Sequence, residues 1–207
     1  VKLDQVSMQF FRNTLHKVQE SLTKALVWRA FWDMVRDGEY SSREFIKMIC
    51  EMIPRESNEA TLSAILKYAD GGIKEYMPIK YREEAYGSVF ETVLKLLTKT
   101  ESSKTNLVIM LRQWLIASAY QQKHVEIVIR WFNKELPELA HIEPGLKNKW
   151  EIVKLAHRQK FLTQNQKLEI FNRVAESDPT DTKILVRKTC DALLADSTKL
   201  RELWEGY

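Results

Sequence analysis

The residues of this chain that could do chemistry are its histidines, hydroxyls and paired carboxylates, and their spacing matches no catalytic or metal-binding pattern. None of the 4 histidines has a second histidine or a cysteine three or four residues away, whereas a zinc site needs several converging ligands. His124 and Glu126 are two residues apart, which places them on different faces of a helix. No serine lies in a Gly-x-Ser-x-Gly elbow. We therefore predict no catalytic or metal-binding residues in this chain, and we interpret the histidines as surface or capping residues.

The cysteines lie within apolar helical patterns. Cys50 and Cys190 are far apart in the sequence, and buried thiols of this kind are usually unreactive. Two cysteines are too few for a disulfide framework, which favours a reducing compartment and a cytoplasmic location. No apolar stretch is long enough to cross a membrane. The chain begins without Met or a signal-peptide pattern, which is typical of a piece of a longer protein.

Charge and aromatic content give no reason to predict nucleic-acid binding. The net charge of +4 comes from 32 basic and 28 acidic residues that are interspersed. Trp28 and Trp32 lie one turn apart in the most apolar helix, so we expect them in a core, and Trp114 and Trp131 have the same character. Base stacking would need exposed aromatic rings beside arginines.

The elements that would position any site are all helices. Hydrophobic residues make up 44% of the chain and charged residues 29%, while 6 glycines and 5 prolines are too few for a turn-rich all-β protein. Apolar residues recur with helical periodicity from about Asp4 to Trp204. We predict an all-α fold of about eleven helices in antiparallel pairs, forming a curved α-α superhelix of the HEAT or armadillo kind. Residues 1–207 would form a single α-helical domain.

Caps and breaks mark the predicted helix ends. Gly38 would end the second helix, and Gly71 and Gly72 would interrupt or end the fourth. Two capping boxes are predicted, at Ser41 with Glu44 and at Thr163 with Gln166. Later helices would begin at Pro179, after a cap by Asp178, and after a cap by Asp196.

Basic residues could hold the carboxylate of a peptide if they face a cavity. Arg112, Lys123 and Arg130 surround the predicted helix pair at 107–133 and are our candidates for peptide contact. Charged residues mostly lie on solvated helix faces, so that interpretation also stays open for each of them.

Two segments resemble a known family. The Trp-Asp-Met-Val-Arg-Asp run at 32–37, the helix start at 42–46 and the Pro-Arg-Glu-Ser turn at 54–57 are similar to the C-terminal helical domain of the zinc-dependent aminopeptidase N family. Near the end, the Asp-Pro-Thr-Asp run at 178–181, followed by Lys199 and Trp204, resembles the closing pattern of that domain. These motifs are caps and core residues, so the resemblance implies a domain and no active site.

The resemblance implies that the chain is the distal part of a larger C-terminal domain. In the family, a His-Glu-x-x-His helix and a downstream glutamate hold zinc, and a Gly-x-Met-Glu-Asn loop binds the substrate's amino group. Both lie in a preceding catalytic domain of the same polypeptide, and neither motif is present here. The implied role is to enclose the active-site cavity and limit the access of peptide substrates, while the parent enzyme removes N-terminal amino acids. No nucleic-acid or membrane partner is implied.

Other functions are compatible with the same sequence. A stand-alone helical-repeat scaffold that binds a protein partner would also be rich in helices and poor in catalytic motifs. A catalytically dead relative of the aminopeptidases is a variant of the first hypothesis. RNA binding by helical repeats is the remaining alternative, and its affinity would fall steeply with salt.

Overall fold

A computed structural model describes residues 2–194 and 197–205, and the described part is all-α, as predicted. The chain divides into two compact units, at 1–124 and 125–207. The α-helices are α1 (Gln5–Thr14), α2 (Ser21–Arg36), α3 (Ser42–Met52), α4 (Glu59–Lys74), α5 (Ile79–Leu97), α6 (Thr105–Ala117), α7 (Gln122–Phe132), α8 (Leu146–His157), α9 (Gln164–Ser177), α10 (Thr182–Leu194) and α11 (Ser197–Glu205). Short 3₁₀ turns lie at Leu15–Lys17, Ile53–Arg55 and Pro137–Leu139.

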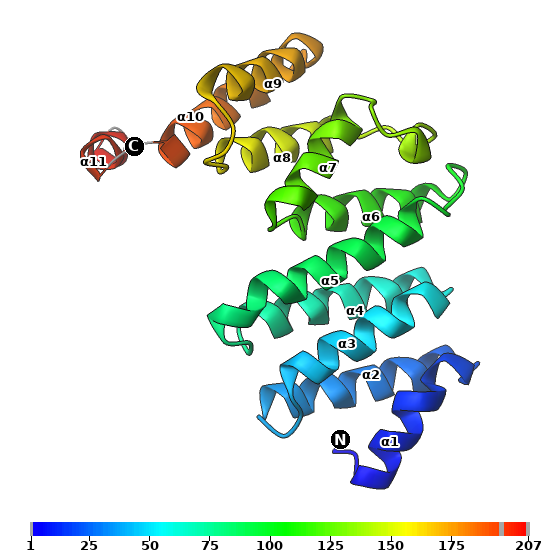
Figure 1. Cartoon of the computed structure of the whole chain (residues 1–207). Coiled ribbons are helices and arrows are strands. Elements are labelled where there is room, and N and C mark those ends of the chain that lie inside the picture. Colours follow the sequence, from blue (N-terminus) through cyan, green and yellow to red (C-terminus); the bar gives the residue numbers. More distant parts are fainter. Residues whose placement is uncertain (1, 195–196, 206–207) are drawn as a thin grey trace. The chain divides into compact units, whose positions relative to one another are not determined.

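Successive helices of the first unit alternate between two layers. Helix α4 contacts both α2 and α6 in one layer, and α3 contacts α5 in the other (Figure 1). From α2 to α6, each helix also packs against its neighbour in sequence, as α3 does on α4 and α5 on α6. Residues 98–104 connect α5 to α6. This order is what stacked helix pairs produce.

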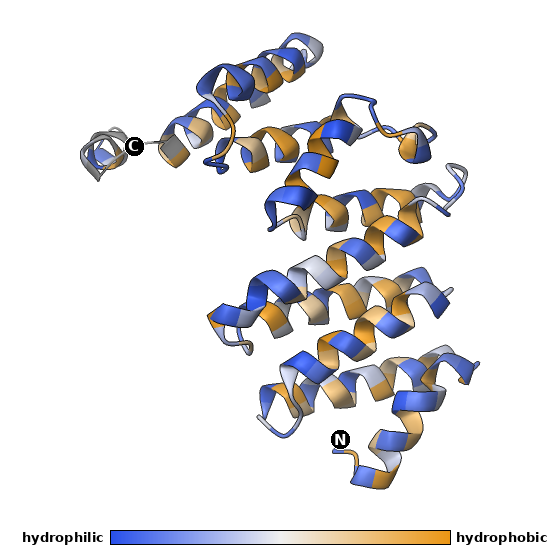
Figure 2. Cartoon of the chain, viewed as in Figure 1, coloured by the Kyte–Doolittle hydropathy of each residue, from blue (hydrophilic) through white to orange (hydrophobic). Residues whose placement is uncertain are grey.

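Large apolar side chains fill the space between these layers. Phe31, Phe45 and Phe90 are fully buried, and Trp28 meets Phe45 edge to face at 6.1 Å between centroids. Burying one such ring contributes roughly 2–3 kcal/mol. Apolar and polar residues alternate around each helix, as Figure 2 shows, so one face of each helix is available for the core.

The glycine pair in α4 does not break the helix, so that prediction is wrong. The helix continues to Lys74. A Cβ on Gly71 would lie 2.8 Å from Cη2 of Trp32, whose ring stacks on Tyr68 at 5.3 Å. Because Gly71 has no side chain, the Trp32 indole on α2 can approach the α4 backbone closely.

The helix caps agree with the sequence in part. Gly38 has a φ of +74° after α2, and Thr163 and Gln166 form both bonds of a capping box on α9, as predicted. Ser41 is the N-cap of α3 but its side chain caps nothing, so the capping box predicted at Ser41 is wrong. Glu44 instead accepts from Arg12 at 3.0 Å and from Lys47 at 3.1 Å.

In the second unit, α8 packs against α9 and α10, and α10 contacts α11. The indole Nε1 of Trp150 donates to Asp178 Oδ2 at 2.6 Å in the buried core of this unit. Asp178 also accepts from the Thr180 amide at 2.8 Å, and α10 begins at Thr182. The prediction of a helix that begins at Pro179 is therefore wrong, because Asp178 shapes the turn that precedes it. The predicted cap at Asp196 lies outside the described residues.

In the part of the chain that the structure describes, no helix combines the length and the apolarity that crossing a bilayer requires.

Candidate functional site

A groove runs between α4 and α6. It has a volume of about 550 Å³ and is lined by Ser63, Lys67, Asp70 and Lys74 of α4 and by Asn106, Ile109, Met110, Gln113, Trp114 and Ala117 of α6. The spacing of these residues by three and four places them on one face of each helix. Another face of α4 carries core residues such as Ile65, Leu66 and Ala69. Amphipathic periodicity thus turns this polar and partly apolar face outward.

The α6 side of the groove is mainly apolar. Ile109 is 43% exposed, and Met110 and Trp114 are half-buried beside it. Ala117 is exposed at the end of the helix and leaves space there. This wall can accept an apolar side chain.

The α4 side of the groove is charged. Lys74 Nζ donates to Asp70 Oδ2 at 2.8 Å, and this bond raises the pKa of Lys74. The Tyr86 hydroxyl donates to the other oxygen of Asp70 at 2.8 Å, and burial with this bond raises the pKa of Tyr86. Lys67 is exposed and meets no carboxylate among the described residues. One lysine of the groove is therefore neutralised by Asp70 and the other is available.

A second hollow lies on the other side of α4. Its volume is about 330 Å³, and α2 and α4 line it with Ala25, Trp28, Ala60, Ala64 and Tyr68 among others. Because Ala60, Ala64 and Tyr68 follow one another at a spacing of four, they share one flank of α4. The layer of α2, α4 and α6 thus carries a hollow on either flank of its central helix.

The other layer has a smaller pocket of about 260 Å³ between α3 and α5. Arg43 lies over the ring of Tyr81 at 4.3 Å from its centroid. Cys50 also lines this pocket, and burial raises the pKa of its thiol to about 11. A thiol with so high a pKa is a poor nucleophile at neutral pH.

The three basic residues predicted to contact peptide lie in different surroundings. Arg112 is half-buried on α6, its Nε donates to Val108 O at 3.4 Å, and burial lowers its pKa. Lys123 is exposed at the start of α7 and lies 3.4 Å from Glu91 Oε1. Arg130 is exposed on the part of α7 that belongs to the second unit. Neither Arg112 nor Lys123 lines the groove between α4 and α6. Their contact with peptide stays a prediction.

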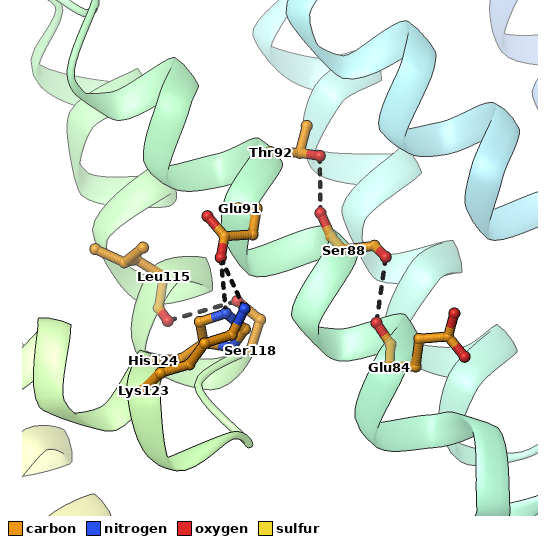
Figure 3. A network of polar contacts seen from close by, with 8 residues as sticks. All are labelled: Glu84, Ser88, Glu91, Thr92, Leu115, Ser118, Lys123 and His124. Carbon is orange, nitrogen blue, oxygen red and sulfur yellow. Dashed lines mark hydrogen bonds and ion pairs between the residues drawn. The ribbon is translucent and has the colours of Figure 1, made fainter.

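Glu91 joins Lys123 to a buried histidine, as Figure 3 shows. His124 Nε2 lies 3.0 Å from the same Oε1 of Glu91, and its ring stacks on Phe90 at 4.2 Å. The small Gly87 makes room for this ring, since a Cβ there would lie 3.2 Å from His124 Cε1. These contacts fix the first turn of α7 on α5.

The histidines were predicted to be surface or capping residues, and for two of them this is wrong. His124 is 0% exposed and His157 is 4% exposed. Each packs against a phenylalanine ring, and His157 Nδ1 also bonds to Val153 O at 2.9 Å. The faces of an imidazole ring are apolar enough to pack against a phenylalanine ring, and in His124 only Nε2 has a hydrogen-bond partner, since its buried Nδ1 has none.

Sequence reasoning missed Lys67 and the groove that it lines, and it placed Trp114 in the core. The signal was present in the polar residues of α4 at positions 63, 67, 70 and 74, which share a face. That face becomes a groove only because α6 lies beside α4, and the sequence alone does not state this pairing.

The described side chains do not form a site for a metal ion. Within residues 2–194 and 197–205, no group of three or more His, Cys, Asp or Glu side chains is placed to hold one. The zinc implied by the family resemblance therefore has no fitting ligand set among the described residues.

Two comparisons with known proteins indicate related families. Over 102 residues the chain is 28% identical to Aminopeptidase N of Streptomyces lividans, a match that covers 49% of this chain and 12% of that protein. The chain thus matches only a small part of that relative. The family model described as the ERAP1-like C-terminal domain matches residues 1–205, which extend through both compact units. A match over nearly the whole chain shows that the chain belongs to the ERAP1-like C-terminal domain family.

Proposed function

We propose that this chain is the helical wall of a zinc aminopeptidase that removes N-terminal amino acids from peptides. In this role it encloses the active-site cavity and limits the access of peptides, and it contributes no catalytic residue. The observation that carries the proposal is the family match over residues 1–205, supported by the partial identity to Aminopeptidase N of Streptomyces lividans. A preceding catalytic domain of the same polypeptide would hold the zinc.

The physical argument for such a role is water exclusion and size selection. A stack of helix pairs offers a broad rigid surface without chemistry of its own. Closing such a surface over a metal site strengthens electrostatic interactions there and keeps folded proteins out. The hollows on either side of α4 would give that wall places to touch a peptide.

The first test asks whether the chain has activity by itself. The purified chain is incubated with fluorogenic aminoacyl amides, with and without added Zn²⁺. We expect no turnover above buffer in either case. Hydrolysis by the chain alone would contradict the proposal, because it would place a catalytic centre within these residues.

The second test asks whether the chain limits access. The parent protein is compared with a version that lacks residues 1–207, using a small aminoacyl amide, an unfolded peptide and a folded protein with a free N-terminus. We expect the truncated version to lose its preference for unfolded peptide over folded protein. An unchanged ratio of the rates for these two substrates, with the small amide still hydrolysed, would reject the enclosing role.

A second candidate is a scaffold that binds a protein partner. It is favoured by exposed apolar side chains on α1 and α2, where Val6 is 79%, Phe10 58%, Leu22 65% and Leu26 59% exposed. Exposed apolar patches often mark protein contacts. A stoichiometric partner that is unrelated to peptidases and is lost on Phe10→Glu would favour this candidate.

A further inference from the structure

We propose that the groove between α4 and α6 binds extended peptide segments through an apolar side chain that is followed by a carboxylate. The groove would then select among peptides by sequence, in addition to enclosing them. This inference rests on the function proposed above and names the kind of segment that the helical wall contacts.

The size and lining of the groove fit one apolar side chain with its neighbours. Its volume of about 550 Å³ lies within the range of pockets that bind small ligands, roughly 300–1,000 Å³. Ile109, Met110 and Trp114 supply the large apolar side chains that α6 contributes to the groove. Burying a leucine-sized side chain against such a wall contributes roughly 1.5–3 kcal/mol.

The charge of the groove favours an acidic neighbour. Lys67 and Lys74 stand against a single carboxylate, Asp70, so the lining residues carry an excess of one positive charge. Asp70 holds Lys74 at 2.8 Å, which leaves Lys67 to meet a charge on the ligand. The long flexible stem of a lysine lets its ammonium reach a carboxylate beside the apolar wall.

The rim of the groove offers partners for a peptide backbone. Asn106 and Gln113 are exposed on the same face of α6. An extended peptide presents N–H and C=O groups that no secondary structure satisfies, and side-chain amides both donate and accept. A nucleic acid fits less well, because base stacking needs exposed rings and the Trp114 ring is half-buried.

The experiment uses the intact chain and its tryptophan indole N–H signals, recorded by ¹⁵N–¹H NMR. Trp114→Phe assigns the Trp114 signal. The probe is a blocked, unstructured hexapeptide with Leu-Glu at its centre, and the matched probes carry Leu-Lys or Ser-Glu instead. Blocked ends remove the terminal charges, so that only the central side chains differ. We expect saturable movement of the Trp114 signal with Leu-Glu, about fivefold weaker binding of Leu-Lys, and about tenfold or more weaker binding of Ser-Glu.

Two variants and one control test the residues. Lys67→Glu should reverse the preference, so that Leu-Lys binds more tightly than Leu-Glu. Ala117→Trp fills the groove from an exposed position and should abolish binding of every probe. Lys95→Glu makes the same change of net charge at an exposed position on α5 and should leave binding unchanged.

The proposal is overturned if the Trp114 signal does not respond to millimolar Leu-Glu peptide, or if Lys67→Glu and Lys95→Glu behave alike. Movement of the signal with protein concentration alone, together with dimers in sedimentation, would mean that a second copy occupies the groove and would also overturn it. The enclosing role is tested separately by deleting residues 1–207 from the parent protein. That role can stand if the groove binds no peptide, so the two failures are distinguishable.

Discussion

At the scale of single residues, close packing explains features whose sequence signals point elsewhere. Gly71 and Gly72 are a typical helix-breaking pair, yet both lie within α4. Propensity scales describe an isolated helix, whereas the Trp32 indole lies against Gly71 and needs its bare backbone. The buried His124 and His157 are a similar case, because Glu91 and Phe171, which they contact, are distant in the sequence.

Substitution of the two glycines should have opposite effects. Alanine in a helix is about 1 kcal/mol more favourable than glycine, but at Gly71 the new Cβ would meet Trp32 at 2.8 Å. Overpacking costs roughly 1–3 kcal/mol, so Gly71→Ala should lower the free energy of unfolding by about 1 kcal/mol. Gly72→Ala meets its nearest neighbour at an ordinary 3.6 Å and should raise that free energy. Urea denaturation measures both, and a Trp32→Leu background should make Gly71→Ala stabilising. Stabilisation by Gly71→Ala in the wild-type background would contradict this packing.

Stability should depend on pH through His157. Burial lowers the pKa of His157 below its ordinary 6.5, with the bond to Val153 acting in the opposite direction and with Lys167, Arg187 and Asp191 nearby. As the pH falls below 6.5, the unfolded chain therefore takes up a proton that the folded chain does not, and stability is lost by up to about 1.4 kcal/mol per pH unit. His157→Gln can still donate to Val153 but does not titrate. Urea midpoints at pH 7.5 and 5.5 should differ less for this variant than for the wild type, and equal differences would refute the assignment.

At the scale of elements, the sequence predicts what is local and misses what is brought in from a distance. All-α structure, the end of α2 at Gly38 and the Thr163 box depend on neighbours within four residues, and they are confirmed. The box at Ser41 fails because Arg12, which is 32 residues away, takes the Glu44 carboxylate. The groove could be predicted only in part. The sequence shows the polar face of α4, but it does not show that α6 lies beside that face.

The two predicted capping boxes can be compared directly. Thr163→Ala removes a bonded cap from α9 and should cost about 1 kcal/mol. Ser41→Ala removes a side chain that caps nothing and should lower the free energy of unfolding by at most about 0.3 kcal/mol. Hydrogen exchange of the first amides in α9 and α3 measures the difference. Equal loss of protection in the two variants would show that the bonds at Thr163 contribute nothing.

At the scale of the whole molecule, the chain consists of two compact units, and α7 belongs to both. Each unit has its own buried aromatic residues, Phe45 and Phe90 in the first and Trp150 and Phe171 in the second. Cores that are separate in this way can lose protection separately. The family match through both units shows that they occur together in this kind of domain.

A core deletion should therefore act mainly on its own unit. Phe45 is 0% exposed, so Phe45→Ala should cost roughly 3–5 kcal/mol. We expect the amides of α2 to α6 to exchange much faster, while those of α8 and α9 keep most of their protection. Hydrogen exchange with mass spectrometry measures this, with Phe171→Ala as the reciprocal variant. An equal loss of protection across both units would mean that the chain unfolds as one cooperative body.

The alternation of helices between two layers restricts how such a chain can change its length. Removing one helix from the first unit would move every later helix of that unit into the opposite layer, where its apolar face would point away from the core. Removing two consecutive helices would preserve the layer of each one that follows. Insertions and deletions of whole helices should therefore come in even numbers among relatives that share this stacking, a parity rule that follows from topology alone.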